Sequence, residues 1–361
     1  MIESLVAVLV ILYLVELCFA LPPHAIVFSR PGWGRFSVAT AAERGLEIRG
    51  RTRLVLAPPL PLGCILVTEV PPLHAAPDGL VPSAAFAWLP LPPPATAAAV
   101  PYSQVSLRRV GTTLLLAGGT RTRWASEPAA TLAADAPNAV AGGTERAWQR
   151  WLQENVARSD EGAIRTRVGD FRRATLPLRV LCTLLFAFLF GVIPVTALLH
   201  LPWSAWHLVA YVALLGGIQV FAWRVGSRFY PADRAKRWTR VFTMLVSPAE
   251  LMCVPHALSR DLLAGHDPLA VAGVLLDGPR FADAAARALR GAHFGTRLPV
   301  ADRERLEGIV RRHGLAAAEL VAAPTQEAGS RVYCPRCHEQ LTLVTAECRN
   351  CAGVPMVEFR A

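Results

Sequence analysis

The sequence predicts a multi-domain α+β membrane protein with about three transmembrane helices, a cytoplasmic β-rich module, a helical region and a small C-terminal metal-binding module. Three observations lead to this expectation. Of the 361 residues, 53% are hydrophobic and only 18% are charged, whereas about a quarter of the residues in a soluble domain are charged. The apolar residues gather in long uncharged runs, and two C-x-x-C pairs lie near the C-terminus. The composition excludes a disordered chain and disfavours an ordinary soluble enzyme.

The first apolar run covers residues 5–21, in which Glu16 is the single charged residue. Its length is about the minimum for an α-helix that crosses a bilayer. A cleaved signal peptide would carry basic residues before the run and small residues after it. This chain has Met-Ile-Glu-Ser before the run and Leu-Pro-Pro-His at its end. We therefore expect residues 1–21 to form an uncleaved N-terminal transmembrane anchor.

Two further apolar runs, residues 180–201 and 206–223, are candidate membrane spans. Pro194 predicts a kink in the first of them, which neighbouring helices can accommodate. The connection between the two runs is very short, so the helices must lie side by side in opposite directions. We therefore expect residues 180–223 to form an antiparallel transmembrane hairpin.

Basic residues set the expected orientation, because loops rich in Arg and Lys stay on the cytoplasmic side of a membrane. Arginines follow the first run, precede the second and follow the third, whereas residues 1–4 and 200–207 contain neither Arg nor Lys. The N-terminus is therefore expected outside and the C-terminus in the cytoplasm. Lys236 is the single lysine among 37 basic residues. This skew is typical of a high-GC bacterial genome, so the expected location is the bacterial inner membrane.

Residues 22–140 are expected to form a β-rich cytoplasmic module. Short β-prone runs alternate there with turn residues, at 35–40, 46–49, 52–56, 63–68, 105–110, 112–116 and 120–124. Repeated prolines between the runs favour edge strands and loops. The last three runs predict a meander that turns at Gly111 and at Gly118-Gly119. The stretch from Val100-Pro-Tyr-Ser-Gln-Val to Ala125-Ser126 resembles the strands of bacterial PH-like domains, which implies a small binding or assembly barrel.

The other cytoplasmic parts are expected to be mainly helical. Residues 141–179 predict a basic juxtamembrane helix, which either binds anionic lipid headgroups or marks the cytoplasmic side of the next span. Residues 224–323 predict a helical region. Within it the hydrophobic stretch 241–258 contains two prolines and charged or polar residues, so we expect a buried or interfacial helix rather than a span. Residues 324–330 are expected to be a linker.

The C-terminal residues 331–361 carry the most specific pattern of the chain. Cys334-Pro-Arg-Cys337 and Cys348-Arg-Asn-Cys351 are two C-x-x-C pairs ten residues apart, with the strand-like Leu341-Thr-Leu-Val-Thr between them. Each pair can place two thiolates on one ion, and four sulfurs around Zn²⁺ form a closed structural site. The segment resembles a zinc ribbon. This resemblance implies that a structural zinc ion is bound by Cys334, Cys337, Cys348 and Cys351.

The second pair departs from the ribbon pattern, because Ala352 stands where Gly is frequent and Gly353 follows one residue later. Disulfides are disfavoured in the cytoplasm, and a thioredoxin-type pair would need a larger α/β domain around it. Iron held by four cysteines is the less favoured metal. A ribbon can bind protein or nucleic acid. Glutamates dilute the nearby arginines, and Tyr333 and Phe359 are the only aromatic residues at hand, which favours protein.

The other candidate catalytic or metal-binding residues give weaker evidence of function than the cysteine pairs do. His266-Asp267 is similar to the dyad of HD-type phosphohydrolases, but Asp267-Pro268 is better explained as a helix N-cap followed by proline at the first helical position. The sequence contains no Walker A loop and no G-x-S-x-G or H-E-x-x-H motif. Whether the protein is an enzyme stays open, with the balance against it.

These features lead to one main functional expectation and two alternatives. The main one is a scaffold, assembly factor or accessory subunit in the bacterial inner membrane, whose partners are the lipid bilayer and membrane or cytoplasmic proteins. The alternatives are a membrane enzyme or transporter component, and a membrane-tethered nucleic-acid-binding regulator. Anionic lipid is a further candidate partner, and nucleic acid is the least expected one.

Overall fold

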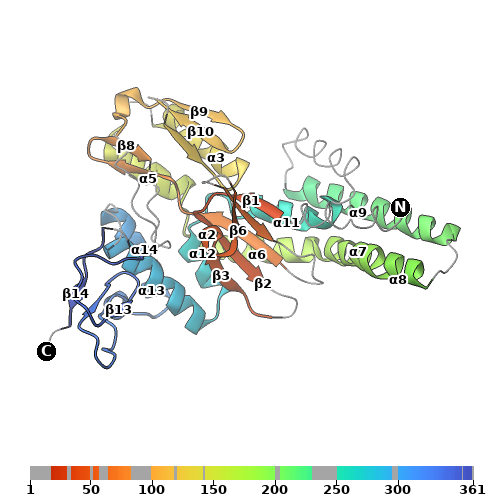
Figure 1. The fold of residues 1–361 in the computed structure, drawn as a ribbon. Helices are drawn as coiled ribbons and strands as arrows, with labels where there is room; N and C mark the ends of the chain where they lie inside the picture. The colour runs from red at the N-terminus through yellow and green to blue at the C-terminus, as the bar shows by residue number, and fades with distance from the viewer. Residues whose placement is uncertain are drawn as a thin grey trace.

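The computed structural model shows a mixed α/β body from which a long helical hairpin projects (Figure 1). The structure describes residues 18–30, 34–48, 52–56, 64–82, 99–117, 120–140, 143–199, 204–229, 250–294, 300–351 and 353–359. The body contains several small antiparallel sheets, a group of helices and a three-stranded module at its C-terminal end.

The centre of the body is a three-stranded antiparallel sheet in the order β3-β2-β6. The middle strand β2 (Ala25–Arg30) pairs with β3 (Ser37–Thr40) on one side and β6 (Cys64–Glu69) on the other. Both faces of this sheet are buried: Ile26 and Phe28 belong to a core shared with helices, and Ala25 and Val27 to a core shared with a second sheet. Such a strand reads as a continuous apolar run without polar alternation.

The second sheet has the order β1-β5-β4, formed by β1 (Cys18–Leu21), β5 (Thr52–Leu56) and β4 (Leu46–Ile48). The expected N-terminal membrane helix therefore does not extend to residue 21. Leu21 precedes Pro22, and the residue before a proline is driven towards extended backbone. It is also fully buried between the two sheets. Residues 1–17, the rest of the expected anchor, lie outside the described residues.

Helices from the second half of the chain cover the other face of the central sheet. The first is α11 (Glu250–Leu262), whose Val254, Leu258 and Leu262 are buried in the shared core. Its Ser259 hydroxyl donates a hydrogen bond to the Ile65 carbonyl of β6. The described part of the stretch expected as a buried or interfacial helix is thus buried. Residues 241–249 lie outside the described residues.

Four more helices complete this layer: α12 (Pro268–Leu275), α13 (Gly278–Phe294), α14 (Val300–Arg312) and α15 (Ala317–Leu320). The helix α14 lies within the region 224–323 that was expected to be helical, and Gly314 follows it with φ +73°. This left-handed conformation is what a helix-ending glycine supplies.

A separate lobe contains the expected meander. β9 (Leu107–Val110), β10 (Thr113–Leu116) and β11 (Arg121–Arg123) form an antiparallel sheet, and Gly111 turns with φ +59°. The hairpin of β7 (Leu73–Ala76) and β8 (Gly79–Pro82) shares the core of this lobe with helices α3 (Glu127–Ala134), α4 (Ala136–Ala139) and α5 (Glu145–Asn155). Among the described residues, β9, β10 and β11 form a three-stranded sheet of their own, without the further strands that a PH-like barrel needs.

The segment 141–179, expected to form a basic juxtamembrane helix, contains two helices and the start of a third at Leu176. The helix α5 ends at Asn155, and α6 (Glu161–Ala174) begins after a break. Asp160 causes the new start, because its carboxylate accepts a hydrogen bond from the Ala163 backbone N–H at 3.1 Å. This N-cap satisfies a backbone donor that a continuous helix would have used otherwise.

The projecting hairpin is formed by α7 (Leu176–Ala187), the π-helical segment η2 (Phe188–Val192), α8 (Ile193–Leu198) and α9 (Ala205–Phe229). Two helical segments, Leu176–Thr196 and Ala205–Phe229, are long and apolar enough to cross a membrane. The chain departs from α-helical geometry at η2, just before Pro194. Proline lacks a backbone N–H, and its ring crowds the carbonyl four residues earlier in the helix. Two of the three expected spans therefore have a helical counterpart in the described chain.

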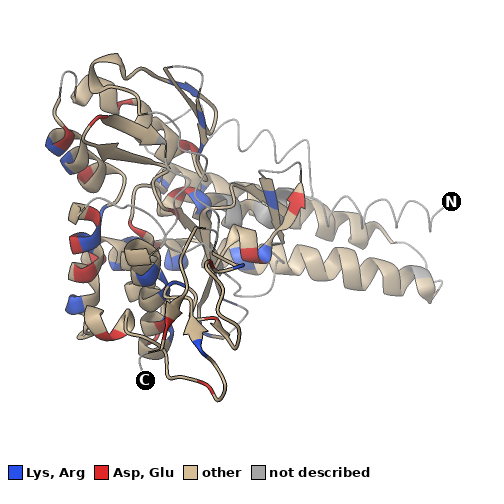
Figure 2. Ribbon diagram, turned by 60° about the vertical axis from the view of Figure 1, so that its left-hand side comes forward, with Lys and Arg blue, Asp and Glu red and all other residues tan. Residues whose placement is uncertain are grey.

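The surface of this hairpin is apolar. In Figure 2 its projecting part carries no charged residue, whereas charged residues are scattered over the body. Large hydrophobic side chains are exposed along it, including Val180, Leu184, Val192, Val195, Leu198, Leu199, Trp206, Leu208, Val209, Val212 and Val220. An apolar surface of this extent needs a partner other than water.

Candidate metal centre

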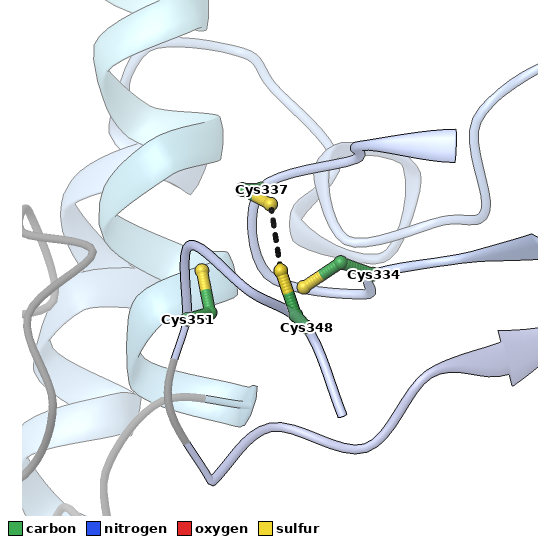
Figure 3. A group of neighbouring side chains, drawn as sticks. All are labelled: Cys334, Cys337, Cys348 and Cys351. Carbon is green, nitrogen blue, oxygen red and sulfur yellow. Dashed lines mark hydrogen bonds between the residues drawn. The ribbon is translucent and has the colours of Figure 1, made fainter. Parts of the chain in front are cut away.

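The four cysteines of the two C-x-x-C pairs come together as the sequence predicts. Their sulfur atoms all lie within 4.8 Å of one another, and Figure 3 shows the side chains converging on a common centre. Cys334, Cys348 and Cys351 are buried, whereas Cys337 is exposed. Among the described residues, these four cysteines form the one cluster of side chains that could bind a metal ion.

The spacing of the sulfurs fits a tetrahedral metal ion. A Zn–S bond of about 2.3 Å in tetrahedral geometry places neighbouring sulfurs about 3.8 Å apart. The Cys337 and Cys348 sulfurs, joined by the dashed line in Figure 3, are 3.7 Å apart. A disulfide would require about 2.05 Å, and all four cysteines are free thiols. The donor set and its geometry could therefore bind a metal ion, and they fit zinc.

Crowding of the four sulfurs also perturbs their proton affinities. Hydrogen bonds with Cys337 and Cys351 lower the pKa of Cys334, whereas hydrogen bonds with Cys334 and Cys337 raise the pKa of Cys351. Burial raises the pKa of Cys348 to about 12. Four thiolates cannot share so small a volume unless a cation neutralises them, which is the role a bound metal ion plays.

Backbone turns hold the sulfurs in place. After the first pair the chain turns at His338, a non-glycine residue with φ 62°, and its N–H donates to the Cys334 carbonyl at 2.9 Å. After the second pair Gly353 has φ +75°, and the Val354 N–H donates to the Cys351 carbonyl at 3.0 Å. Gly353 thus supplies the left-handed turn of the second knuckle, one residue later than the family pattern would place it.

Two polar residues that the sequence did not single out support the site. Arg336 lies inside the first C-x-x-C and is 6% exposed. Burial lowers the pKa of its guanidinium, and the negative charge of the cysteines opposes that shift. Glu339 accepts hydrogen bonds from the Cys348 thiol at 3.5 Å and from the Asn350 amide at 2.9 Å. The sequence could have indicated both residues, because they lie within or just after the first C-x-x-C pair, and residues next to a metal ligand stay close to the metal.

A small sheet carries the knuckles. The strand β12 (Val332–Tyr333) pairs with β13 (Gln340–Leu341) and with β14 (Val357–Glu358). The strand expected at 341–345 ends at Leu341, and the chain after it is an irregular loop. This loop exposes Leu343 (76%) and Val344 (61%) to solvent. The module thus has a buried cysteine cluster and an apolar loop facing outward.

The module that carries the cysteines (residues 331–359) lies beside α13 and α14 of the body (Figure 1). The segment 324–330 has neither helix nor strand, as a linker should, but it is bound to the module. Gln340 donates to the Thr325 carbonyl at 2.8 Å and accepts from the Glu327 N–H at 2.9 Å.

The His266-Asp267 pair has a structural role. The Asp267 carboxylate caps α12 by accepting from the Leu269 N–H at 2.7 Å, as the helix-cap interpretation predicts, and it forms an ion pair with Arg305 of α14. Burial lowers the pKa of His266 to about 4, so this imidazole is neutral at pH 7. Among the described residues neither side chain belongs to a metal-binding group.

No protein-family model, curated protein or solved structure matches this chain. The class of the site rests on the four close cysteines and the small sheet around them, which together are consistent with a zinc-ribbon-like module.

Proposed function

We propose that the protein is a membrane-anchored scaffold, assembly factor or accessory subunit of the bacterial inner membrane, which contacts other proteins through its zinc ribbon. The observation that carries this proposal is the ribbon loop, where Leu343 and Val344 are exposed beside a rigid cysteine cluster. Apolar side chains held outward on a fixed framework are suited to a protein interface.

The hairpin supplies the anchor. Its two long helices expose apolar side chains to their surroundings, and a bilayer is the environment that accepts such helices. Both helices meet the body at the same end (Figure 1), where Arg172, Arg173, Arg179, Arg224 and Arg228 lie. Arginines concentrated at one end of a hairpin favour the cytoplasmic side for that end, and with it for the body and the ribbon.

The charge of the ribbon favours protein over nucleic acid as its partner. Residues 331–359 contain three arginines and three glutamates, and one of those arginines, Arg336, is buried. Four thiolates around Zn²⁺ add two further negative charges. A nucleic-acid surface needs a concentrated basic face, and the ribbon has none among its described residues.

We expect the full-length tagged chain, extracted from its native membrane in a mild detergent, to bring a partner protein with it in a fixed ratio. Exchanging both Leu343 and Val344 for serine removes the exposed apolar contact, so the partner should fall at least about tenfold relative to the chain. Burial of two such side chains is worth roughly 3 kcal/mol or more, and each 1.4 kcal/mol is tenfold in affinity. Quantitative mass spectrometry of the purified complex measures the ratio.

Leu46→Ser is the matched control, because Leu46 is exposed to a similar degree (73%) but lies on β4 of the body. This variant should retain the partner. A complex that survives the Leu343→Ser, Val344→Ser exchange would contradict the proposed role of the loop. Recovery of bound nucleic acid that is released steeply by salt would instead support the regulator alternative.

A further inference from the structure

A cavity of about 600 Å³ lies on the body, between the end of β2 with residues 34–36, one face of α6 and the end of α12. Its size is within the usual range for small-molecule sites. The residues that α6 contributes are Arg165, Val168, Gly169 and Arg172, whose spacing places them on one face of that helix. Three chain segments that are far apart in sequence therefore converge on one cavity.

The lining of this cavity is strongly basic. It contains four arginines, namely Arg30, Arg35, Arg165 and Arg172, and a single acidic residue, Asp277. The formal charge of the lining is therefore +3. Clefts lined by charge of one sign concentrate ligands of the opposite sign.

The single acidic group is already paired. Arg35 donates to the Asp277 carboxylate at 2.7 Å, and Arg280 lies 3.9 Å from its other oxygen. The hydrogen bond from Arg35 lowers the pKa of Asp277, which keeps this carboxyl ionised and engaged. Asp277 is thus not available to neutralise the remaining arginines of the cavity.

Among the described residues, the other three arginines of the cavity have no acidic partner. Arg30 donates to the Gly34 carbonyl at 2.7 Å, and its guanidinium lies 6.0 Å from the centre of the Phe36 ring. Within the described chain, neither Arg165 nor Arg172 forms a side-chain ion pair. By contrast Arg173, next along α6, is paired with Asp170 at 2.8 Å and does not line the cavity.

Topology alone does not account for this arrangement. A positive flank next to a membrane span explains why arginines are frequent in each segment, but it does not explain why Arg30 and Arg35 meet Arg165 and Arg172 in one cavity, 130 or more residues apart in the sequence. The planar guanidinium matches phosphate oxygens with two parallel hydrogen bonds. We propose that this cavity binds a phosphate group, held by Arg165 and Arg172 of α6 together with Arg30 of β2.

The position of the cavity suggests two sources for that phosphate. Arg172 precedes the first residue of the apolar segment Leu176–Thr196 by four positions, which is about 6 Å along a helix. This is the depth of lipid headgroups when the segment crosses a bilayer. A phospholipid headgroup and a soluble phosphate compound offer the same chemistry, so the experiment has one arm for each.

Both arms use the full-length chain in a maltoside detergent, which carries no phosphate. In the soluble arm, inorganic phosphate and glycerol 3-phosphate are titrated by calorimetry. In the lipid arm, phosphatidylglycerol is added and retained lipid is counted by native mass spectrometry. Saturable binding in either arm is expected, and the Arg165→Gln, Arg172→Gln double variant should weaken it about 100-fold, since each charged hydrogen-bond donor is worth roughly tenfold.

Two further variants make the result specific. Arg173→Gln removes the same charge from the same helix outside the cavity and should bind as the unaltered chain does. Gly169→Leu keeps every charge but fills the cavity, because a Cβ at Gly169 meets no atom within 4 Å. Leucine also favours a helix more than glycine does, so this variant should fold and lose binding at least tenfold.

The source of the phosphate follows from which arm shows the loss. The proposal is overturned if neither arm shows binding. It is also overturned if Arg173→Gln weakens binding as much as the double variant, or if Gly169→Leu binds normally. This test is independent of the zinc ribbon, since none of the altered residues belongs to residues 331–359.

Discussion

Cys348→Ser is expected to release the metal ion and unfold the C-terminal module. The site would keep three sulfurs, and a serine hydroxyl is a poor replacement for a thiolate on zinc. The apolar core of the module consists of little more than the buried cysteines and Val354, with Met356 packed against them. Metal binding contributes roughly 10–16 kcal/mol to small zinc modules, so this core cannot hold the fold alone. The zinc content measured by elemental analysis should fall from one ion per chain to near zero.

Proteolysis gives a second measurement of the same loss. Arg331 and Arg349 are exposed residues held within the folded module, and trypsin should cut after them much faster in Cys348→Ser or after treatment with a chelator. Cys182→Ser is the control, because Cys182 lies in α7, far from the cluster in sequence, and should retain its metal. A Cys348→Ser chain that keeps one tightly bound ion and resists trypsin would refute the assignment of the ligands.

The second large effect is expected from Arg305→Ala in α14. Arg305 forms an ion pair with Asp267, whose side chain is only 3% exposed, and donates to Asp302 at 3.3 Å. Removing the guanidinium leaves a buried carboxylate without its counter-charge. Breaking one partner of a buried pair costs about 3–5 kcal/mol, so the midpoint of thermal unfolding in detergent should fall by roughly 5–10 °C.

Arg303→Ala provides the matched comparison, because Arg303 lies on the same helix and forms no ion pair within the described part of the chain. Its effect should stay within about 0.5 kcal/mol. Equal melting temperatures for the two variants would show that the contact between α12 and α14 does not depend on the Asp267–Arg305 pair.

Local elements were predictable from the sequence where local chemistry determines them. The meander at 105–124 forms where β-prone runs meet Gly111, and α12 begins where Asp267-Pro268 supplies a cap and a starting proline. The strand β2 was not predicted, although it is the centre of the body. Its Ala-Ile-Val-Phe run lacks polar alternation because both of its faces are buried, and periodicity alone does not reveal such a strand.

Contacts between segments far apart in the chain could not be predicted from the sequence. Nothing near residue 26 indicates that its strand packs against helices formed after residue 250. The clustering of the four cysteines was predictable because C-x-x-C spacing fixes local turns. The exposed loop at Leu343 was not predictable, since its residues have the composition of a strand. In the described structure β13 ends at Leu341, and the residues directly after it pair with no other strand. The arginine-lined cavity likewise depends on tertiary contacts.

We propose that a membrane hairpin holds the body and its zinc-ribbon-like module on the cytoplasmic side. Reporter fusions in living cells test it most directly, with alkaline phosphatase and green fluorescent protein placed after residues 60, 203 and 361. Phosphatase becomes active outside the membrane, whereas the fluorescent protein folds in the cytoplasm. We expect phosphatase activity after residue 203 only, and fluorescence after residues 60 and 361. Phosphatase activity after residue 361, or fluorescence after residue 203, would contradict it.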